Sequence, residues 1–171
     1  MTVMKKLIIS AVLALFCTAA GAQTETYVKV GDKVPSFKVA MTDGRTIDIA
    51  DLKGKVVLVN FWATWCGPCR SELKRVQKEV IDRFAGRDFV FLPISREEDK
   101  ATVEKFLEEE GYTWVSGLDP ERKIYSLFAE GGIPRNFLIG TDGRIVLCET
   151  GYTAEKFDEM LEIIEKTLEK K

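Results

Sequence analysis

Hydrophobic and polar residues alternate on both sides of Asp43-Gly44, with the apolar positions at Phe37, Val39, Met41, Ile47 and Ile49. A period of two is typical of a strand with one buried face. Asp-Gly between two such strands favours a tight turn, because glycine adopts the left-handed backbone conformation that this turn requires. We therefore predict a β-hairpin near the start of the folded chain.

The next two segments differ in their apolar pattern. Val56–Phe61 is almost continuously apolar and rich in β-branched residues, which is typical of a central strand buried on both faces. Between Gly67 and Ala85 the apolar residues recur at helical spacing, at Cys69, Leu73, Val76, Val80 and Phe84. This stripe predicts an amphipathic helix that ends at Gly86.

Strands and helices go on alternating to the end of the chain. We predict a strand at Phe89–Ile94, a helix from about Asp99 to Gly111, a short strand at Tyr112–Val115, a helix starting at Asp119-Pro120-Glu121, a hairpin of strands 136–141 and 144–149, and a last helix from about Ala154. Such alternation predicts one α/β domain, with a mixed central sheet covered by helices on both faces. We place this domain at residues 34–171 and a polar tether at residues 23–33.

Residues 1–22 have the pattern of a secretory signal peptide. Lys5 and Lys6 precede an apolar run, and Ala20-Gly21-Ala22 provides a cleavage site. The uncharged stretch from Leu7 to Gln23 has 17 residues, at the lower limit for crossing a bilayer, so an uncleaved membrane anchor is the alternative. Bulky Phe16 before Cys17 argues against a lipoprotein signal. We expect export to the periplasm.

Composition narrows the chemistry. The formal net charge is −2, without basic blocks, which argues against nucleic-acid binding. Histidine is absent, which excludes Ser-His-Asp and Cys-His catalysis and any histidine-ligated metal. After removal of the leader three cysteines remain, namely Cys66, Cys69 and Cys148. One close pair with one left over indicates redox chemistry rather than a disulfide scaffold.

Cys66-Gly67-Pro68-Cys69 lies where the buried strand ends and the amphipathic helix begins. The positive end of the helix dipole lowers the pKa of a thiol there, so we predict that Cys66 is a nucleophile. Pro68 suits the first helical turn. Cys69, on the apolar stripe, is the shielded partner that would release a mixed disulfide formed by Cys66. Without a second Cys-x-x-Cys pair or histidine, a structural zinc site is not expected.

The stretch from Val56 to Glu72, with Trp65-Cys66-Gly67-Pro68-Cys69 at its centre, resembles the thioredoxin superfamily and its TlpA/ResA-like exported branch. The resemblance extends from about Val34 to the C-terminus. It implies a thioredoxin-like fold with an N-terminal β-hairpin and a central insertion between Ser95 and Gly132. It also implies thiol–disulfide exchange on protein substrates, mostly in the reducing direction, without a cofactor and with a membrane thiol protein as electron donor. We expect a monomer.

The same resemblance assigns further residues. Ile133-Pro134 matches the cis-proline loop that packs against the dithiol and binds substrate. Glu72 matches an active-site glutamate; the alternative is a solvated residue paired with Arg75. Asn60 replaces the buried aspartate of thioredoxin proper, and Lys74 stands where thioredoxins have a helix-kinking proline, so a straighter helix is expected.

Other interpretations of the remaining residues stay open. Trp65 adjoins Cys66, so it is expected to shield the dithiol and contact substrate together with Gly67 and Pro68, whereas Trp62 is expected in the core. Cys148 is expected to be a buried structural thiol, with a third redox sulfur as the alternative. The functional alternatives are a disulfide oxidase or isomerase, a Cu(I)-binding module, and a partner-binding domain without enzymatic activity.

Overall fold

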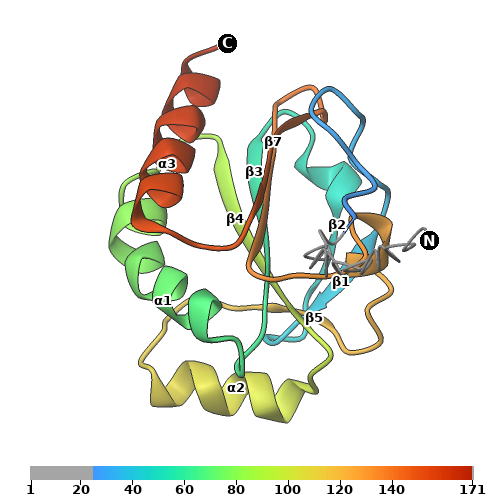
Figure 1. Cartoon of the computed structure of the whole chain (residues 1–171), viewed down its shortest axis with the longest axis vertical. Coiled ribbons are helices and arrows are strands. Elements are labelled where there is room, and N and C mark those ends of the chain that lie inside the picture. Colours follow the sequence, from blue (N-terminus) through green and yellow to red (C-terminus); the bar gives the residue numbers. More distant parts are fainter. Residues whose placement is uncertain (1–24, 171) are drawn as a thin grey trace, which may run out of the picture.

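The computed structural model describes residues 25–170, so the leader expected at residues 1–22 lies outside the described part. Seven strands in this part form one sheet: β1 (Lys38–Met41), β2 (Thr46–Asp48), β3 (Val56–Trp62), β4 (Phe89–Arg96), β5 (Gly117–Asp119), β6 (Arg135–Ile139) and β7 (Ile145–Thr150). The helices are α1 (Gly67–Val76), α2 (Lys100–Glu109) and α3 (Ala154–Glu169), with short helical turns at Ile49–Leu52, Gln77–Asp82 and Tyr125–Leu127 (Figure 1).

The sheet is mixed, as predicted. Its strand order is β2-β1-β5-β4-β3-β6-β7, in which β3, β4 and β5 are parallel and the other neighbouring pairs are antiparallel. The hairpin around Asp43-Gly44 is confirmed as β1 and β2. β3 lies between β4 and β6, and all seven of its residues are buried. The expected central strand is therefore confirmed, and its C-terminal end points to α1.

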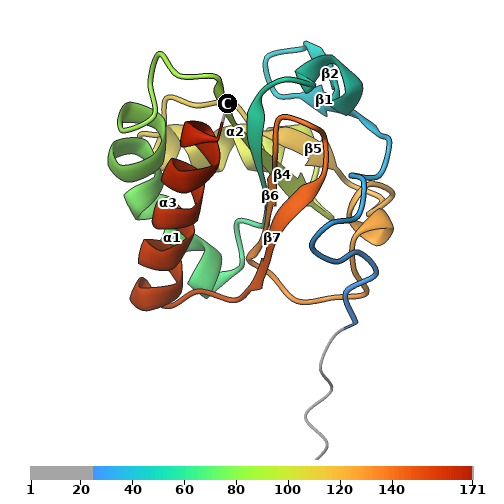
Figure 2. The same ribbon diagram turned by 90° about the horizontal axis from the view of Figure 1, so that it is seen from above.

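Residues of β3 alternate between two cores. Leu58 and Trp62 contribute to a core shared with α1, α2 and α3, whereas Val59 and Phe61 contribute to a core shared with Tyr125 and other residues on the opposite face. Figure 2 shows α1 and α3 on one side of the sheet, with the N-terminal segment and the turn at Tyr125–Leu127 on the other. Asn60, two residues from both Leu58 and Trp62, faces the helices by this alternation.

Two predicted elements are wrong. The strand expected at Tyr112–Val115 is absent, and β5 begins later, at Gly117. Tyr112 and Trp114 stack instead at 5.1 Å between ring centroids, and Trp114 packs edge-on against Trp62, so burial of the aromatic rings outweighs strand pairing.

The helix expected from Asp119 is also wrong. The carboxylate of Asp119 accepts hydrogen bonds from the backbone N–H groups of Ile124 and Tyr125, the latter at 2.7 Å, and so caps only the turn at Tyr125–Leu127. Arg122 adopts a φ of 58°, a conformation that a right-handed helix does not contain. The acid at the start of the segment therefore caps a later and shorter turn.

The helix expected over 67–85 is present but divided. α1 ends at Val76 and continues as a wider π-helical turn at Gln77–Asp82, although no proline interrupts it. Both predicted ends of the next helix, α2, are confirmed. Asp99 caps its N-terminus, and Gly111 follows its C-terminus with a φ of 70°. Among residues 25–170, no helix combines the length and apolar character that crossing a bilayer demands.

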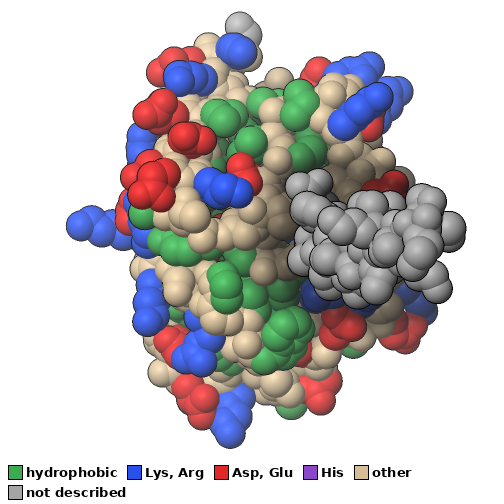
Figure 3. All heavy atoms as spheres, in the orientation of Figure 1, with side chains coloured by type: hydrophobic (Ala, Val, Ile, Leu, Met, Phe, Trp, Pro, Cys, Tyr) green, Lys and Arg blue, Asp and Glu red, His purple; other side chains and the backbone are tan. Residues whose placement is uncertain are grey.

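Residues 25–33, expected as a tether, are hydrogen-bonded along the domain. Thr26 forms an isolated β-bridge with Ala129, and Lys33 forms one with Arg144. On the face shown in Figure 3, acidic and basic side chains are intermixed around apolar patches. This mixture agrees with the small net charge of −2.

Candidate active site

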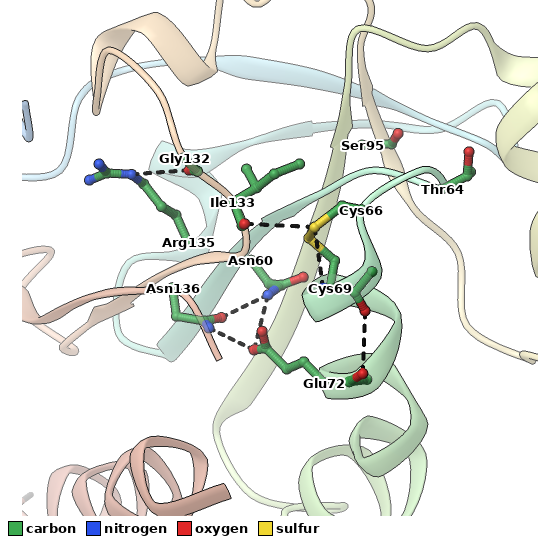
Figure 4. Close-up of a disulfide and its surroundings, with 12 residues drawn as sticks. Asn60, Thr64, Cys66, Cys69, Glu72, Ser95, Gly132, Ile133, Arg135 and Asn136 are labelled. Atoms are coloured by element: carbon green, nitrogen blue, oxygen red, sulfur yellow. Dashed lines mark hydrogen bonds between the residues drawn. A yellow bond between two sulfur atoms is a disulfide. The ribbon is translucent and has the colours of Figure 1, made fainter. Parts of the chain in front are cut away.

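Cys66 and Cys69 are joined by a disulfide at the junction of β3 and α1, with their Cα atoms 5.2 Å apart (Figure 4). Cys66 is the N-cap residue of α1, and Pro68 lies in the first helical turn. Proline is favourable there because its missing N–H would have no partner within the helix. The buried strand thus delivers one cysteine to the mouth of the helix, and the first turn brings the second cysteine beside it.

The surroundings of Cys66 favour a negative charge on its sulfur. The backbone N–H of Cys69 points at Cys66 Sγ, with the two atoms 3.2 Å apart. Free N–H groups and the helix dipole stabilise an anion at this position, so reduction of the disulfide would leave a stabilised thiolate. Cys66 is 5% exposed and Cys69 only 1%, so an incoming group meets Cys66 first.

The second side of the disulfide is formed by the loop before β6. The Ile133–Pro134 peptide bond is cis, as the sequence resemblance implies, and the carbonyl oxygen of Ile133 lies 3.6 Å from Cys66 Sγ. Two buried side chains anchor this loop. The Tyr125 hydroxyl donates to the carbonyl of Gly132 at 2.6 Å, and Arg135 Nε donates to the carbonyl of Gly131 at 2.9 Å.

Glu72 lies inside the protein, one turn after Cys69 on α1, and is 2% exposed. Its Oε1 accepts hydrogen bonds from the side-chain amides of Asn136, at 2.6 Å, and Asn60, at 3.3 Å, while Oε2 is buried without a partner. Burial raises the pKa of Glu72 from 4.5 to about 7, and the hydrogen bond from Asn136 opposes this shift.

The alternative placement of Glu72 at the surface beside Arg75 is not observed. Arg75 instead pairs with Glu79 and with Asp158 of α3, at 2.5 Å and 2.6 Å. A carboxyl group that titrates near neutral pH, with no cation bonded to it, can give up or take a proton at little cost. Cys69 must lose its thiol proton before it can attack a disulfide, so a nearby group that can take up a proton suits this site.

Asn60 and Asn136 reach Glu72 because of strand register. β3 and β6 pair so that Asn60 and Asn136 stand directly opposite each other, and Asn60 Nδ2 donates to Asn136 Oδ1 at 2.8 Å. From the sequence, Asn60 is identified only as the replacement for the buried aspartate of thioredoxin proper, and Asn136 is not identified. A single asparagine in each of two largely apolar strands is the signal that could have indicated the pair.

Trp65, Gly67 and Pro68 form the exposed rim around the disulfide. Trp65 is 60% exposed, and the guanidinium carbon of Arg96 lies 5.8 Å from its ring centroid. Trp62, by contrast, is fully buried against Phe106 and Trp114, which confirms its place in the core. The rim therefore offers an aromatic surface next to Cys66.

Cys148 is separate from the dithiol. Its half-buried side chain packs in the core on the face of the sheet away from α1, where Sγ lies 3.9 Å from the carbonyl oxygen of Val28. Burial raises the pKa of this thiol, which makes it less reactive. Residues 25–170 contain no cluster of three or more metal-ligating His, Cys, Asp or Glu side chains.

Comparisons with known proteins agree with this geometry. Residues 30–147 match the model of the AhpC/TSA family. The chain is 31% identical over 169 residues to the thiol-disulfide oxidoreductase ResA of Geobacillus thermodenitrificans, covering 94% of this chain and 97% of that protein. It is 30% identical over 128 residues to ResA of Bacillus subtilis, covering 75% of this chain and 71% of that protein.

Two solved structures are similar as well. A protein from Bacteroides thetaiotaomicron, provisionally described as a protein disulfide isomerase, superposes with a TM-score of 0.82 at 33% identity and covers 86% of this chain and 94% of its own. A thiol:disulfide interchange protein of the thioredoxin family from Chlorobium tepidum superposes with a TM-score of 0.69 at 27% identity, covering 82% of this chain and 98% of its own.

Proposed function

Because this chain belongs to the AhpC/TSA family, within the thioredoxin superfamily, and is a thiol–disulfide oxidoreductase, we propose that it is an exported reductant of protein disulfides. The thioredoxin-like fold expected from the sequence is confirmed by the solved structures that it resembles. The observation that carries the proposal is the position of Cys66 Sγ, between the Cys69 N–H at the start of α1 and the carbonyl of Ile133.

The proposed reaction has two exchange steps. In the reduced protein the Cys66 thiolate attacks one sulfur of a substrate disulfide; a Cys66–substrate bond forms, the substrate S–S bond breaks, and the other substrate sulfur leaves as a thiolate. The Cys69 thiolate then attacks Cys66 Sγ, which restores the Cys66–Cys69 disulfide and releases the second substrate thiolate. A thiol electron donor must then reduce the disulfide before the next turnover.

Glu72 is proposed as the proton acceptor for Cys69. The second step needs Cys69 as a thiolate, although this residue is 1% exposed and its thiol has little access to water. A glutamate with a pKa of about 7, one helical turn away, is partly ionised at neutral pH and can accept the thiol proton. Replacement of Glu72 by Gln should change the pH dependence of substrate reduction; an unchanged profile would remove Glu72 from the mechanism.

Substrate binding is assigned to the rim and the loop beside the disulfide. Trp65, Gly67 and Pro68 are exposed next to Cys66, where an approaching polypeptide would contact them. The backbone of Ile133, held in place by the cis bond to Pro134, would pair with that polypeptide in a β-like manner. Trp65→Ala should therefore raise KM for a protein disulfide more than it affects a small disulfide reagent.

The direction of the reaction is open to a direct measurement. The Gly67-Pro68 dipeptide resembles that of reducing thioredoxin, whose reduction potential is about −270 mV, against about −120 mV for the oxidant DsbA. We expect a value near the first, measured by equilibration with dithiothreitol buffers. A value near the second would indicate the alternative, an oxidase or isomerase, and would contradict the reducing role.

Trapping of the mixed disulfide would identify the substrates. Cys69→Ser removes the resolving thiol, so adducts on Cys66 accumulate and can be named by mass spectrometry. The matched control is the double substitution Cys66→Ser and Cys69→Ser, which leaves only Cys148 among the cysteines that follow the leader. Adducts that persist in this control, or their absence in the single variant, would contradict the proposed mechanism; tight Cu(I) binding without adducts would favour the metal-binding alternative.

Export follows from the signal-peptide pattern of residues 1–22. We expect a mature chain that begins at Gln23 in the periplasmic fraction, a monomeric state and a membrane thiol protein as donor. Intact-mass measurement and size-exclusion chromatography check the first and second. Retention of the full-length chain in the membrane fraction would support the uncleaved anchor instead.

A further inference from the structure

A second buried carboxylate bonds to the connection that leads from β3 to Cys66. Glu98, in the turn between β4 and α2, is 7% exposed, and both of its oxygens have partners. Oε2 accepts from the backbone N–H of Thr64 at 2.9 Å and from the hydroxyl of Ser95 at 2.7 Å, and Oε1 accepts from the Thr64 hydroxyl. In Figure 4, Thr64 and Ser95 lie on the opposite side of Cys66 from Asn136.

The backbone at Glu97 turns Glu98 inward. Glu97 has a backbone φ of 63°, which residues other than glycine rarely adopt. Its N–H bonds to the carbonyl of Asp119 at 3.0 Å. Such a conformation is unfavourable and persists only where its surroundings hold it. Asp99, the next residue after Glu98, caps α2 through the N–H of Thr102 at 2.8 Å. Of three consecutive acids, only the middle one is buried.

Glu98 bonds to Thr64, which belongs to the segment between β3 and α1 that sets the position of Cys66. Thr64 lies in the four-residue connection from β3 to α1, residues 63–66, and the Cys66 N–H bonds to the carbonyl of Ala63 at 3.2 Å. A half-buried backbone N–H needs an acceptor, and Glu98 supplies one for Thr64 from 34 residues further along the chain. Its second bond, to the Thr64 hydroxyl, fixes the side chain of the same residue.

We propose that Glu98 is a positioning residue for the redox centre, which holds the connection at Thr64 so that Cys66 Sγ lies at the N-terminus of α1. This role rests on the proposed function of Cys66 as the nucleophile. Without Glu98 the connection loses the two hydrogen bonds that hold Thr64, Cys66 moves away from the helix N–H groups, and its thiolate is stabilised less. Through the contact between Glu98 and Thr64, the central insertion acts on the segment that precedes the dithiol.

The test measures alkylation of Cys66 by iodoacetamide as a function of pH, in the Cys69→Ser background, with the Cys66 peptide quantified by mass spectrometry. For Glu98→Ala we expect the apparent thiol pKa to rise by about one unit, so alkylation at neutral pH falls by up to about tenfold. Glu98→Gln should stay within about twofold of the parent, because its amide oxygen can accept from Thr64 N–H and its NH₂ can donate to the Thr64 hydroxyl.

Two further variants keep the test independent of folding. Thr64→Val removes only the hydroxyl bond to Glu98 and should give a shift of the same sign as Glu98→Ala but smaller. Ser95→Ala, the matched control, removes a bond to Glu98 without touching Thr64 and should stay within about twofold of the parent. Circular dichroism checks that each variant is folded.

The proposal is overturned if folded Glu98→Ala has the parental pH profile, or if Glu98→Gln falls as far as Glu98→Ala. If Glu98→Ala does not fold, a parental profile for Thr64→Val overturns it instead. Alkylation needs no protein substrate and no direction of electron flow. A parent that fails to reduce any protein disulfide would thus contradict the proposed function while leaving the effect of Glu98 on Cys66 intact.

Discussion

The carboxyl group of Glu72 links protonation to the stability of the whole domain. Its oxygen partners are two amides, and burial favours the neutral form. The folded pKa of about 7 lies above the ordinary value of 4.5, so between these two pH values the folded chain binds more protons than the unfolded chain. Folding stability must therefore decrease as the pH rises through this range.

Replacement of Glu72 by Gln should remove this loss. Below pH 4.5 the glutamate is protonated in both states, so the variant and the parent should differ little; above pH 7 the oxidised variant should be more stable by up to about 3 kcal/mol. Urea unfolding between pH 4 and pH 8 measures the difference. Glu159→Gln, an exposed change on α3, is the control. A difference that does not depend on pH would contradict the assignment.

Asn136 tunes the same group in the opposite sense. Its amide donates to Glu72 Oε1 at 2.6 Å and favours the ionised carboxylate, which holds the pKa lower than burial alone would. Asn136→Ala should therefore raise the pKa of Glu72 further, as followed by carbon NMR of the carboxyl group during titration. Asn60→Ala, which removes a longer bond of 3.3 Å, should shift it less. A lower pKa in Asn136→Ala would contradict the role of the Asn136 amide in favouring the ionised carboxylate.

At the scale of elements, β5 is held close to its neighbours by a glycine. A Cβ atom on Gly117 would lie 2.6 Å from Val39 Cγ2 and 3.3 Å from the carbonyl oxygen of Pro93. Gly117→Ala should therefore destabilise the fold by about 1–3 kcal/mol, because β1 or β4 must move to make room. Urea unfolding gives the magnitude.

The control for this change is Gly67→Ala, where an added Cβ meets nothing within 4 Å. The double variant Gly117→Ala with Val39→Ala should cost less than the sum of the two single changes, since the truncated valine relieves the clash. Strict additivity would mean that the strain lies elsewhere.

Local pattern predicted the elements whose burial follows from their own residues. The nearly continuous apolar run of β3 and the caps and stripes of α2 and α3 are present in the structure because no distant contact opposes them. The segment 112–127 was predicted poorly, because Trp114 and Asp119 each satisfy partners that only the tertiary fold brings near.

The same distinction holds for the candidate site. The spacing of Cys66 and Cys69 indicated the disulfide directly, since both cysteines lie within one turn. Asn136 is 64 residues from Glu72, and Glu98 is 34 residues from Thr64; β-strand register and a left-handed turn at Glu97 bring them together. Neither of these two contacts produces a periodic pattern of apolar residues, so neither could be predicted from a single sequence.

At the scale of the whole molecule, residues 25–33 form hydrogen bonds with distant parts of the domain, including the arginine that anchors the loop beside the disulfide. Tyr27 N–H bonds to the carbonyl of Phe128 at 2.8 Å, and Gly31 N–H bonds to that of Ile145 at 2.9 Å. Arg135, which anchors the loop before Pro134, also donates to the hydroxyl of Thr26. The segment thus contributes to the core on the face away from α1, although its composition is that of a polar tether.

A mature chain that begins at Val34 instead of Gln23 should therefore be less stable, by about 2–6 kcal/mol for several hydrogen bonds of about 0.5–1.5 kcal/mol each. It should also reduce protein disulfides more slowly, because Arg135 then holds the loop at Ile133 with one acceptor fewer. Thr26→Val separates the two effects: it keeps the backbone bonds, costs about 1 kcal/mol and still slows the reaction. Urea unfolding and insulin reduction measure both quantities. If the truncated chain unfolds at the same urea concentration as the longer one, residues 25–33 are a tether after all, and the hydrogen bonds that they form add nothing to the net stability of the domain.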